Sequence, residues 1–373
     1  MWRVVPRSRI RVLTLLASGA CVALASCAGA PLVHEPLDPE FQRGVALGFV
    51  DATADGVAPG AAPGTLGAVI GEVRTLGASD VSILVPLETE GIDGRTVARD
   101  SLDDVSLRRA IITARSRGLH VMVFPIVRLR ARLPGEWRGK LRPADRAAWF
   151  DDYTRELEAI ALVCEQAGAE RLVIGSELVS FEDDAASWHA LALRVRRLYR
   201  GKLVYSANWD RYHDVKFWDA VDEIGISAYF TLAPRGSDPS VAELRDAWRP
   251  IVASLAVFSA RTRRPIVFTE VGFPSVSGAA FWPWNDHQLQ RVCAQGEGCE
   301  GATSMEAQRR LWAAFVSVFS DRASTRFLAG VYVWLWAGQG GLRDRGYTPR
   351  GKPAEAVVKL WYGGGRARPV PRL

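Results

Sequence analysis

The stretch "RPIVFTEVGFPS", residues 264–275, runs from an apolar segment directly into a carboxylate. The apolar residues have the composition of a buried strand, Glu270 follows with no basic residue beside it, and a glycine and a proline then end regular structure. A second stretch, "RLVIGSELVS" at 171–180, repeats this arrangement, because its apolar residues lead into Glu177. Two apolar strands that each lead into a glutamate predict a functional site where those strands end.

Apolar runs of this kind recur eight times, and amphipathic helical patterns lie between most of them. Continuous apolar runs are typical of parallel strands that are covered on both faces. Eight strand–helix units in roughly 320 residues favour a single-domain (β/α)8 barrel, an α/β fold, over a doubly wound sheet. No G-x-G-x-x-G and no P-loop supports a nucleotide-binding alternative. The runs lie at 44–50, 81–87, 119–127, 171–175, 202–208, 223–230, 265–270 and 329–336.

In such a barrel the active site lies at the carboxyl ends of the strands. Glu177 follows the fourth run and Glu270 ends the seventh, so both are expected at one mouth. Two carboxyl groups suit glycoside hydrolysis, in which one protonates the leaving oxygen and the other attacks the anomeric carbon or activates water. Taken singly, Glu177 could cap the next helix and Glu270 could pair with a buried arginine. Together they favour the catalytic interpretation.

Other acidic residues are weaker candidates. Glu88, Glu90 and Asp210 follow other strands, whereas Asp222 and Glu223 precede the sixth run and are expected at the opposite, stabilising face. The sequence has no metal-ligand cluster and no G-x-S-x-G motif. We therefore expect neither a metal nor another cofactor.

A series of motifs recurs in a specific order around these strands: "IGSEL" (174–178), "NWD" (208–210), "FWDAVDEIGISAYF" (217–230), "FTEVGFPS" (268–275), "PW" (283–284), "WLWAG" (334–338) and "GYTPRGKPA" (346–354). From about residue 44 to 362 the chain resembles clan A of the glycoside hydrolases and, within it, family 113, the barrel β-mannanases. The resemblance implies a retaining enzyme with Glu177 as acid/base and Glu270 as nucleophile. It also implies that Tyr229 hydrogen-bonds the nucleophile and that the indole of Trp336 forms the floor of the subsite that binds the reacting sugar.

Two positions depart from the pattern of the family. Ser176 stands where the clan commonly has an asparagine that binds the sugar 2-hydroxyl, and Ile126 follows Pro125 where a polar residue is frequent. Because the contact with the 2-hydroxyl strengthens in the transition state, both departures leave the identity of the sugar open.

Aromatic residues supply flat apolar surface for the C–H faces of sugar rings. The chain has 13 tryptophans, and Trp284 is among those expected in a loop at the cleft rim. Asn208, at the end of the fifth run, offers an amide for sugar hydroxyls, although a role in a turn is equally consistent.

Residues 1–26 have the pattern of an export signal, with an arginine-rich start and an apolar run too short for a membrane span. The run ends in "LASC", which resembles a bacterial lipobox in which Cys27 is diacylated; the alternative is a plain secretory signal. We expect a lipid-anchored envelope protein, in the outer rather than the inner membrane. A tether would follow over 27–41, the barrel over 42–362 and a basic tail over 363–373.

The net charge and the remaining cysteines add two further expectations. The formal net charge of +6 owes much to the arginines of the signal, so nucleic-acid binding gains no support. Cys293 and Cys299 flank a flexible loop and are expected to form a small disulfide in an oxidising compartment.

The sequence therefore predicts a monomeric retaining β-glycoside hydrolase that cleaves mannan-like polysaccharide or oligosaccharide. One alternative is the same mechanism acting on another β-glycan. A second alternative, from a different functional class, is a barrel that binds glycan without cleaving it.

Overall fold

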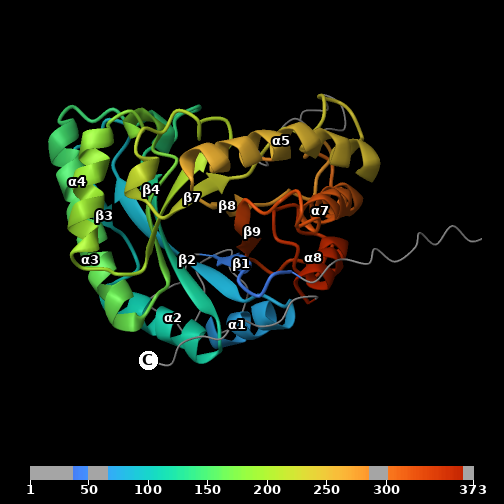
Figure 1. Cartoon of the computed structure of the whole chain (residues 1–373), viewed down its shortest axis with the longest axis horizontal. Helices are drawn as coiled ribbons and strands as arrows, with labels where there is room; N and C mark the ends of the chain where they lie inside the picture. Colours follow the sequence, from blue (N-terminus) through green and yellow to red (C-terminus); the bar gives the residue numbers. More distant parts are fainter. Residues whose placement is uncertain (1–36, 49–65, 285–300, 364–373) are drawn as a thin grey trace, which may run out of the picture. The chain divides into compact units, whose positions relative to one another are not determined.

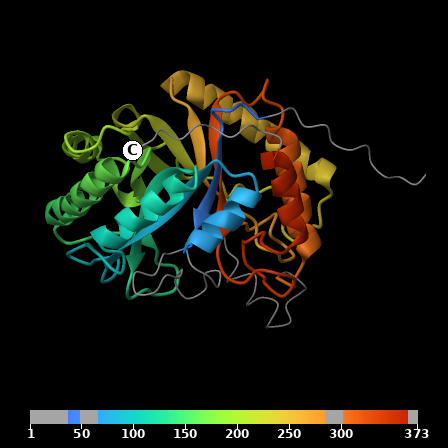
Figure 2. The same cartoon turned by 90° about the horizontal axis from the view of Figure 1, so that it is seen from below.

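The computed structural model describes residues 37–48, 66–284 and 301–363. Within these residues, eight parallel strands form a closed barrel, because β1 pairs with both β2 and β9 (Figures 1 and 2). A short ninth strand, β3 (Ala98–Arg99), pairs antiparallel with β2. The barrel strands are β1 (Gln42–Leu47), β2 (Asp80–Thr89), β4 (His120–Leu129), β5 (Arg171–Ser176), β6 (Lys202–Asn208), β7 (Glu223–Ser227), β8 (Ile266–Val271) and β9 (Leu328–Trp336). The predicted (β/α)8 architecture is confirmed.

Helices surround the barrel and cover the outer face of its sheet (Figure 1). Their starts follow from local chemistry: Ser240 and Glu243 form a reciprocal capping box at α5, and aspartate side chains cap α2, α3 and α4. The α-helices are α1 (Leu66–Thr75), α2 (Asp104–Ser116), α3 (Arg146–Ala167), α4 (Ala185–Arg196), α5 (Val241–Thr262), α7 (Met305–Phe319) and α8 (Pro353–Gly363).

The core has two apolar layers. The larger layer lies between sheet and helices and contains fully buried indoles, among them Trp149, Trp188 and Trp312. The smaller layer fills the barrel interior with side chains from alternate positions of the strands. Tyr332 needs a glycine opposite it, because a Cβ at Gly44 would lie 2.2 Å from its ring. The interior layer comprises Leu84, Met122, Phe124, Val173, Val204, Val267 and Tyr332.

Below this layer, the amino-terminal floor of the barrel holds a network of buried charges. Arg171 donates to Glu223 at 2.9 Å and lies 3.4 Å from Asp80, and both carboxylates are 0 % exposed. Lys202 donates to the other oxygen of Glu223 at 2.7 Å. The expectation that Glu223 lies at the stabilising face is confirmed, since its carboxylate joins four strands of the floor together with Gln42.

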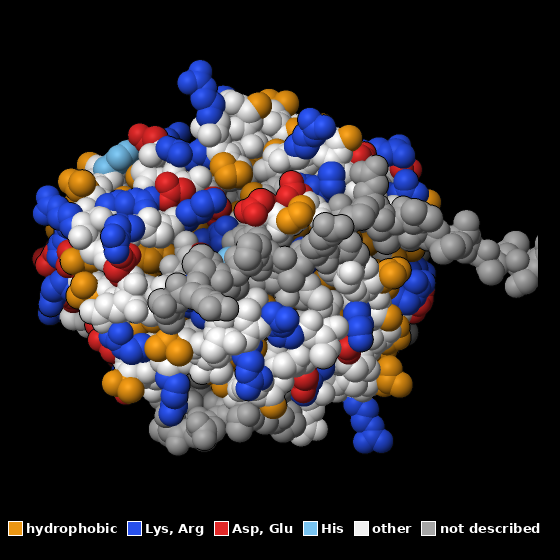
Figure 3. All heavy atoms as spheres, turned by 60° about the horizontal axis from the view of Figure 1, so that its bottom comes forward, with side chains coloured by type: hydrophobic (Ala, Val, Ile, Leu, Met, Phe, Trp, Pro, Cys, Tyr) orange, Lys and Arg blue, Asp and Glu red, His pale blue; other side chains and the backbone are white. Residues whose placement is uncertain are grey.

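Residues 37–41, which precede β1, pack against the barrel domain. Leu37 and Phe41 are each 2 % exposed, and Phe41 packs edge-on against Trp361 at 5.8 Å. Apolar burial therefore draws residues 37–41 into the barrel domain. Among the described residues, no helix has the length and apolar content to cross a membrane. On the face shown in Figure 3, basic and acidic side chains are interspersed and hydrophobic atoms form small separate groups.

Candidate active site

The two predicted glutamates lie at the carboxyl end of the barrel, each after an irregularity in its strand. On β5 the register shifts between Val173 and Gly175, and on β8 one extra residue precedes Glu270 relative to β7. Such bulges re-aim the side chains that follow them. The bulges on β5 and β8 thus help to turn Glu177 and Glu270 toward the mouth.

Glu177 has a backbone φ of 52°, a left-handed value that costs a non-glycine residue about 1–3 kcal/mol. Its N–H donates to the carbonyl of Ser206 at 2.8 Å. Its carboxylate accepts from Arg138 at 2.8 Å, and the Nε of the same guanidinium donates to the carbonyl of Ser176 at 3.2 Å. Arg138 therefore fixes both the backbone and the side chain of this strand end.

Arg138 is the site residue that sequence reasoning missed. It lies on η1 (Arg138–Lys140), in the loop after β4, among several other arginines of the same segment. Neither strand periodicity nor a motif distinguishes it from its neighbours. Only the folded position of the loop brings this guanidinium to Glu177.

Glu270 is buried at the end of β8, with 3 % of its surface exposed. The hydroxyl of Tyr229 donates to its Oε2 at 2.9 Å, while Oε1 has no hydrogen-bond partner among the described residues. Burial raises the pKa of Glu270 to about 8, helped by the nearby charge of Glu177 and opposed by Arg138 and the Tyr229 hydrogen bond. The charge of Glu177 therefore acts on the protonation of Glu270, so the two carboxyl groups interact.

The surroundings of the two glutamates differ. Arg138 contacts Glu177 directly, and Glu270 is the more deeply buried carboxyl. The raised pKa of Glu270 means that its surroundings favour its protonated form.

The prediction for Trp336 is wrong in its placement. Trp336 is 2 % exposed in the outer layer, and its Nε1 donates to Glu72 of α1 at 3.0 Å. Trp334 is the partly exposed indole that packs on the barrel interior. The cause is an irregular register, because two residues of β1 span three of β9 between Val333 and Trp336. The indole at the mouth is therefore Trp334.

The remaining predicted polar residues lie at the same end of the barrel. Ser176 is 2 % exposed, pairs in register with Ser206, and has a hydroxyl with no partner among the described residues. Asn208 accepts the N–H of Trp209 at 2.9 Å through its side-chain oxygen, so it does serve in a turn. Trp284 is 41 % exposed, and its ring lies 5.2 Å from that of Trp209. These two indoles form an aromatic surface on the rim.

Two predictions fall outside the described residues: lipidation of Cys27 and the pairing of Cys293 with Cys299. Across residues 37–48, 66–284 and 301–363, no group of three or more His, Cys, Asp or Glu is arranged to hold a metal ion.

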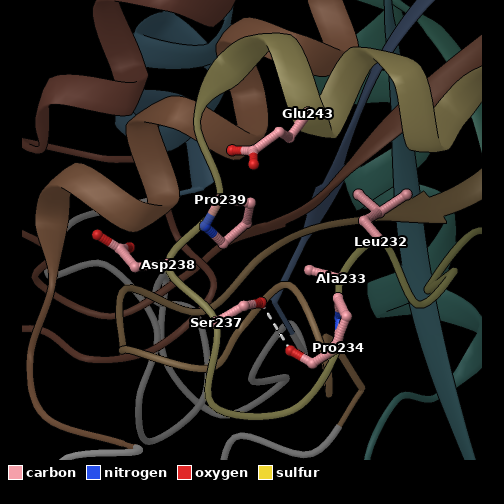
Figure 4. Close-up of a pocket in the computed structure, with 7 residues that line it drawn as sticks. All are labelled: Leu232, Ala233, Pro234, Ser237, Asp238, Pro239 and Glu243. Carbon is pink, nitrogen blue, oxygen red and sulfur yellow. Dashed lines mark hydrogen bonds between the residues drawn. The ribbon is translucent and has the colours of Figure 1, made fainter.

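A separate surface hollow of about 280 Å³ lies in the loop between β7 and α5 (Figure 4). Its carboxylates are engaged elsewhere: Glu243 accepts from Ser240, and Asp238 pairs with Arg310. The hollow therefore lacks the paired carboxyl groups of the mouth. It is lined by Leu232, Ala233, Pro234, Ser237, Asp238, Pro239 and Glu243.

A closed (β/α)8 barrel with two interacting glutamates at its mouth has the architecture of a barrel glycoside hydrolase. The sequence model of Glycoside Hydrolase Family 113 matches residues 92–350. The chain therefore belongs to glycoside hydrolase family 113 and is a glycoside hydrolase.

Solved structures agree with this assignment. The GH113 β-mannanase AaManA from Alicyclobacillus acidocaldarius, in complex with ManMIm, has a TM-score of 0.71 and 26% identity, covering 87% of this chain and 97% of its own. A GH113 β-1,4-mannanase complex has a TM-score of 0.71 and 23% identity, covering 87% and 99%. A family 5 mannosidase from Rhizomucor miehei shares the fold, with a TM-score of 0.56 and 11% identity, covering 87% and 93%. No curated protein sequence matches the chain significantly.

Proposed function

We propose that this glycoside hydrolase cleaves β-linked, mannan-like polysaccharide or oligosaccharide with retention of anomeric configuration. The observation that carries the proposal is the interacting pair of Glu177 and Glu270, with Tyr229 bonded to one oxygen of Glu270. Its membership of family 113 and its likeness to β-mannanase structures favour mannan as the first substrate to test.

In the proposed first step, the unpaired Oε1 of Glu270 attacks the anomeric carbon while Glu177 gives its proton to the glycosidic oxygen. The bond from the anomeric carbon to the leaving oxygen breaks, and a glycosyl ester forms on Glu270. In the second step water attacks the same carbon, Glu177 takes a proton from the water, and the ester bond breaks. The proton of the pair must therefore lie on Glu177 when substrate is bound.

Two features of the mouth bear on the choice of sugar. Trp334 is partly exposed and packs on the barrel interior, so its indole offers the apolar surface that a sugar platform requires. Ser176 has a shorter side chain than asparagine, and its buried hydroxyl lacks a partner in the described part of the chain. With serine instead of asparagine at position 176, we expect the contact with the sugar 2-hydroxyl to differ from that in other clan members. Initial rates on β-mannan, β-glucan, xylan and galactan decide between mannan and another β-glycan.

The decisive test of the mechanism is a pair of alanine variants. Glu270→Ala should lower turnover below about 10⁻³ of wild type, and azide should restore it as an inverted glycosyl azide. Glu177→Ala should still form the covalent intermediate from a 2,4-dinitrophenyl glycoside, and azide should then give the retained product. A 2-deoxy-2-fluoroglycoside should label Glu270 in the wild-type enzyme, as shown by peptide mass. Absence of hydrolysis and of labelling would favour a barrel that only binds glycan.

We further propose that the protein is exported and anchored by lipid on Cys27, in the outer membrane. The support is the "LASC" motif after a short apolar run, with alanine rather than aspartate following the cysteine. Cys27→Ser should abolish palmitate labelling and release the protein from membranes. Unchanged labelling and membrane association would contradict the lipobox.

A further inference from the structure

We propose that Tyr205 and Glu182 form a positioning unit that holds the turn bearing Glu177 in its working conformation. This inference rests on the proposed role of Glu177 as acid/base. Neither residue belongs to the carboxyl pair, and neither is needed for the chemical steps themselves.

The hydroxyl of Tyr205 joins the two ends of this turn. It accepts the backbone N–H of Leu178, the residue after Glu177, at 3.2 Å. It also donates to Oε1 of Glu182 at 2.9 Å. A phenol has a single proton, so acceptance from the backbone leaves that proton available for the carboxyl group. One side-chain atom thereby ties the start of the turn to its end.

The turn between these contacts needs such a tie. Glu177 adopts the left-handed φ of 52°, and Leu178 then leads into the single 3-10 turn η2 (Val179–Phe181). A short turn of this kind does not by itself hold a strained residue, because strain persists only where the surroundings over-determine it. The bonds to Tyr205 supply that constraint on the residues that follow Glu177, whereas Arg138 holds its carboxylate and the preceding carbonyl.

Tyr205 acts from outside the barrel. Its ring is fully buried in the outer layer, with Phe217 edge-on at 4.8 Å and Trp188 edge-on at 5.0 Å. Dense packing on several sides allows its hydroxyl little freedom to follow a moving turn. Because it faces the helices rather than the mouth, Tyr205 influences the reaction only through Glu177.

Within the described part of the chain, the side chain of Glu182 is held by its hydrogen bond with Tyr205. It is 2 % exposed, and its Oε2 has no hydrogen-bond partner within the described part of the chain. Burial raises the pKa of this carboxyl to about 7, against the hydrogen bond from Tyr205 and the charge of Arg211. A carboxyl group buried with one oxygen unpaired costs stability, so its contact with Tyr205 accounts for its position.

The test compares Tyr205→Phe with Tyr199→Phe. Tyr199 is a matched control, because its buried hydroxyl donates to the carbonyl of Ala169 at 2.9 Å, before the opposite end of β5. Tyr205→Phe should lower kcat/KM on unactivated mannooligosaccharide about 10- to 100-fold, as expected for a misplaced catalytic group. The burst of dinitrophenolate from an activated mannoside should change little, because that step needs no proton from Glu177. Tyr199→Phe should leave the ratio of the two rates unchanged.

A second variant guards against a Tyr205→Phe protein that does not fold. Glu182→Gln keeps the size of the side chain and an acceptor for Tyr205 but removes the charge. Glu182→Gln should lower kcat/KM on unactivated mannooligosaccharide less than Tyr205→Phe does. It too should change the burst from the activated mannoside little. Equal losses on both substrates in these variants, or no loss beyond that of Tyr199→Phe, would overturn the proposal.

Hydrogen exchange separates this inference from the proposed function. The amide of Leu178 should exchange faster in Tyr205→Phe than in wild type, and Tyr199→Phe should leave it protected. Unchanged protection in Tyr205→Phe overturns the positioning unit whatever the activity. If the wild-type protein neither hydrolyses a glycoside nor reacts with the fluoroglycoside, the proposed function is overturned. Hydrogen exchange at Leu178 still tests the positioning unit in that case.

Discussion

The two ends of the barrel each bury a pair of carboxyl groups, but they surround them differently. At the floor, Asp80 and Glu223 face two cations, Arg171 and Lys202. At the mouth, Glu177 and Glu270 have one cation in contact among the described residues, Arg138. The two floor carboxylates are therefore matched by two cations, whereas the two carboxyl groups of the mouth have one such contact among the described residues.

The pKa shifts follow this difference. Burial alone would raise the pKa of Glu223, but the charges and hydrogen bonds of Arg171 and Lys202 outweigh it and hold the pKa below its ordinary value. At Glu270, burial and the neighbouring carboxylate together raise the pKa. A balanced buried network stabilises one protonation state, whereas an unbalanced pair keeps a proton that can move.

The largest effect on stability is expected at the floor. Glu223→Gln should lower the free energy of unfolding by about 3–5 kcal/mol, because it leaves Arg171 buried without its main partner. Urea unfolding measures the loss, and the turnover of the molecules that remain folded should be nearly unchanged. Glu306→Gln, which breaks a surface pair with Arg309, is the control and should cost less than about 1 kcal/mol. A cost that small at Glu223 would contradict the comparison.

At the mouth, loss of a carboxylate should raise the free energy of unfolding instead of lowering it. The folded pKa of Glu270, about 8, lies above the unfolded value of roughly 4.3. The associated stability is fully present below the unfolded pKa and is lost as pH rises through about 8. At alkaline pH the free energy of unfolding of Glu270→Gln should therefore exceed that of wild type by several kcal/mol, at most about 5 kcal/mol. This gain should shrink toward zero as the pH falls to the unfolded pKa; a gain that grows on acidification would contradict the assignment.

The smallest effect concerns Arg138, the cation that contacts Glu177. Arg138 opposes the rise in the pKa of Glu270, so Arg138→Gln should raise that pKa further. The acidic limb of kcat/KM on an activated substrate should move up by roughly half to one pH unit. Lys140→Gln on the same short helix is the control, since its amine bonds to the carbonyl of Gly135 instead. A limb that moves to lower pH would show that Arg138 does not act on Glu270.

The barrel and its two glutamates were predictable because they depend on local pattern. Each strand is a continuous apolar run, and Glu177 and Glu270 come where such runs end. Arg138 was not predictable, because its role arises from the path of a loop. The resemblance to the family pointed to Trp336, but the extra residue of β9 beside β1 turns Trp336 outward and leaves Trp334 on the barrel interior. Sequence reasoning therefore located both glutamates and Tyr229, which donates to Glu270, but not Arg138, which contacts Glu177.

The pairing of β1 with β9 determines when the barrel can close during folding. Gln42 of β1 and Tyr332 of β9 are hydrogen-bonded across 290 residues of sequence. Folding during synthesis proceeds from the amino terminus, and contacts between distant segments form slowly. Until the last strand emerges, β1 and β8 each present an unpaired edge where β9 will lie. Before β9 is synthesised, the sheet cannot close into a barrel. Pairing of β9 with β1 and β8 therefore removes the two edges at which another chain could pair.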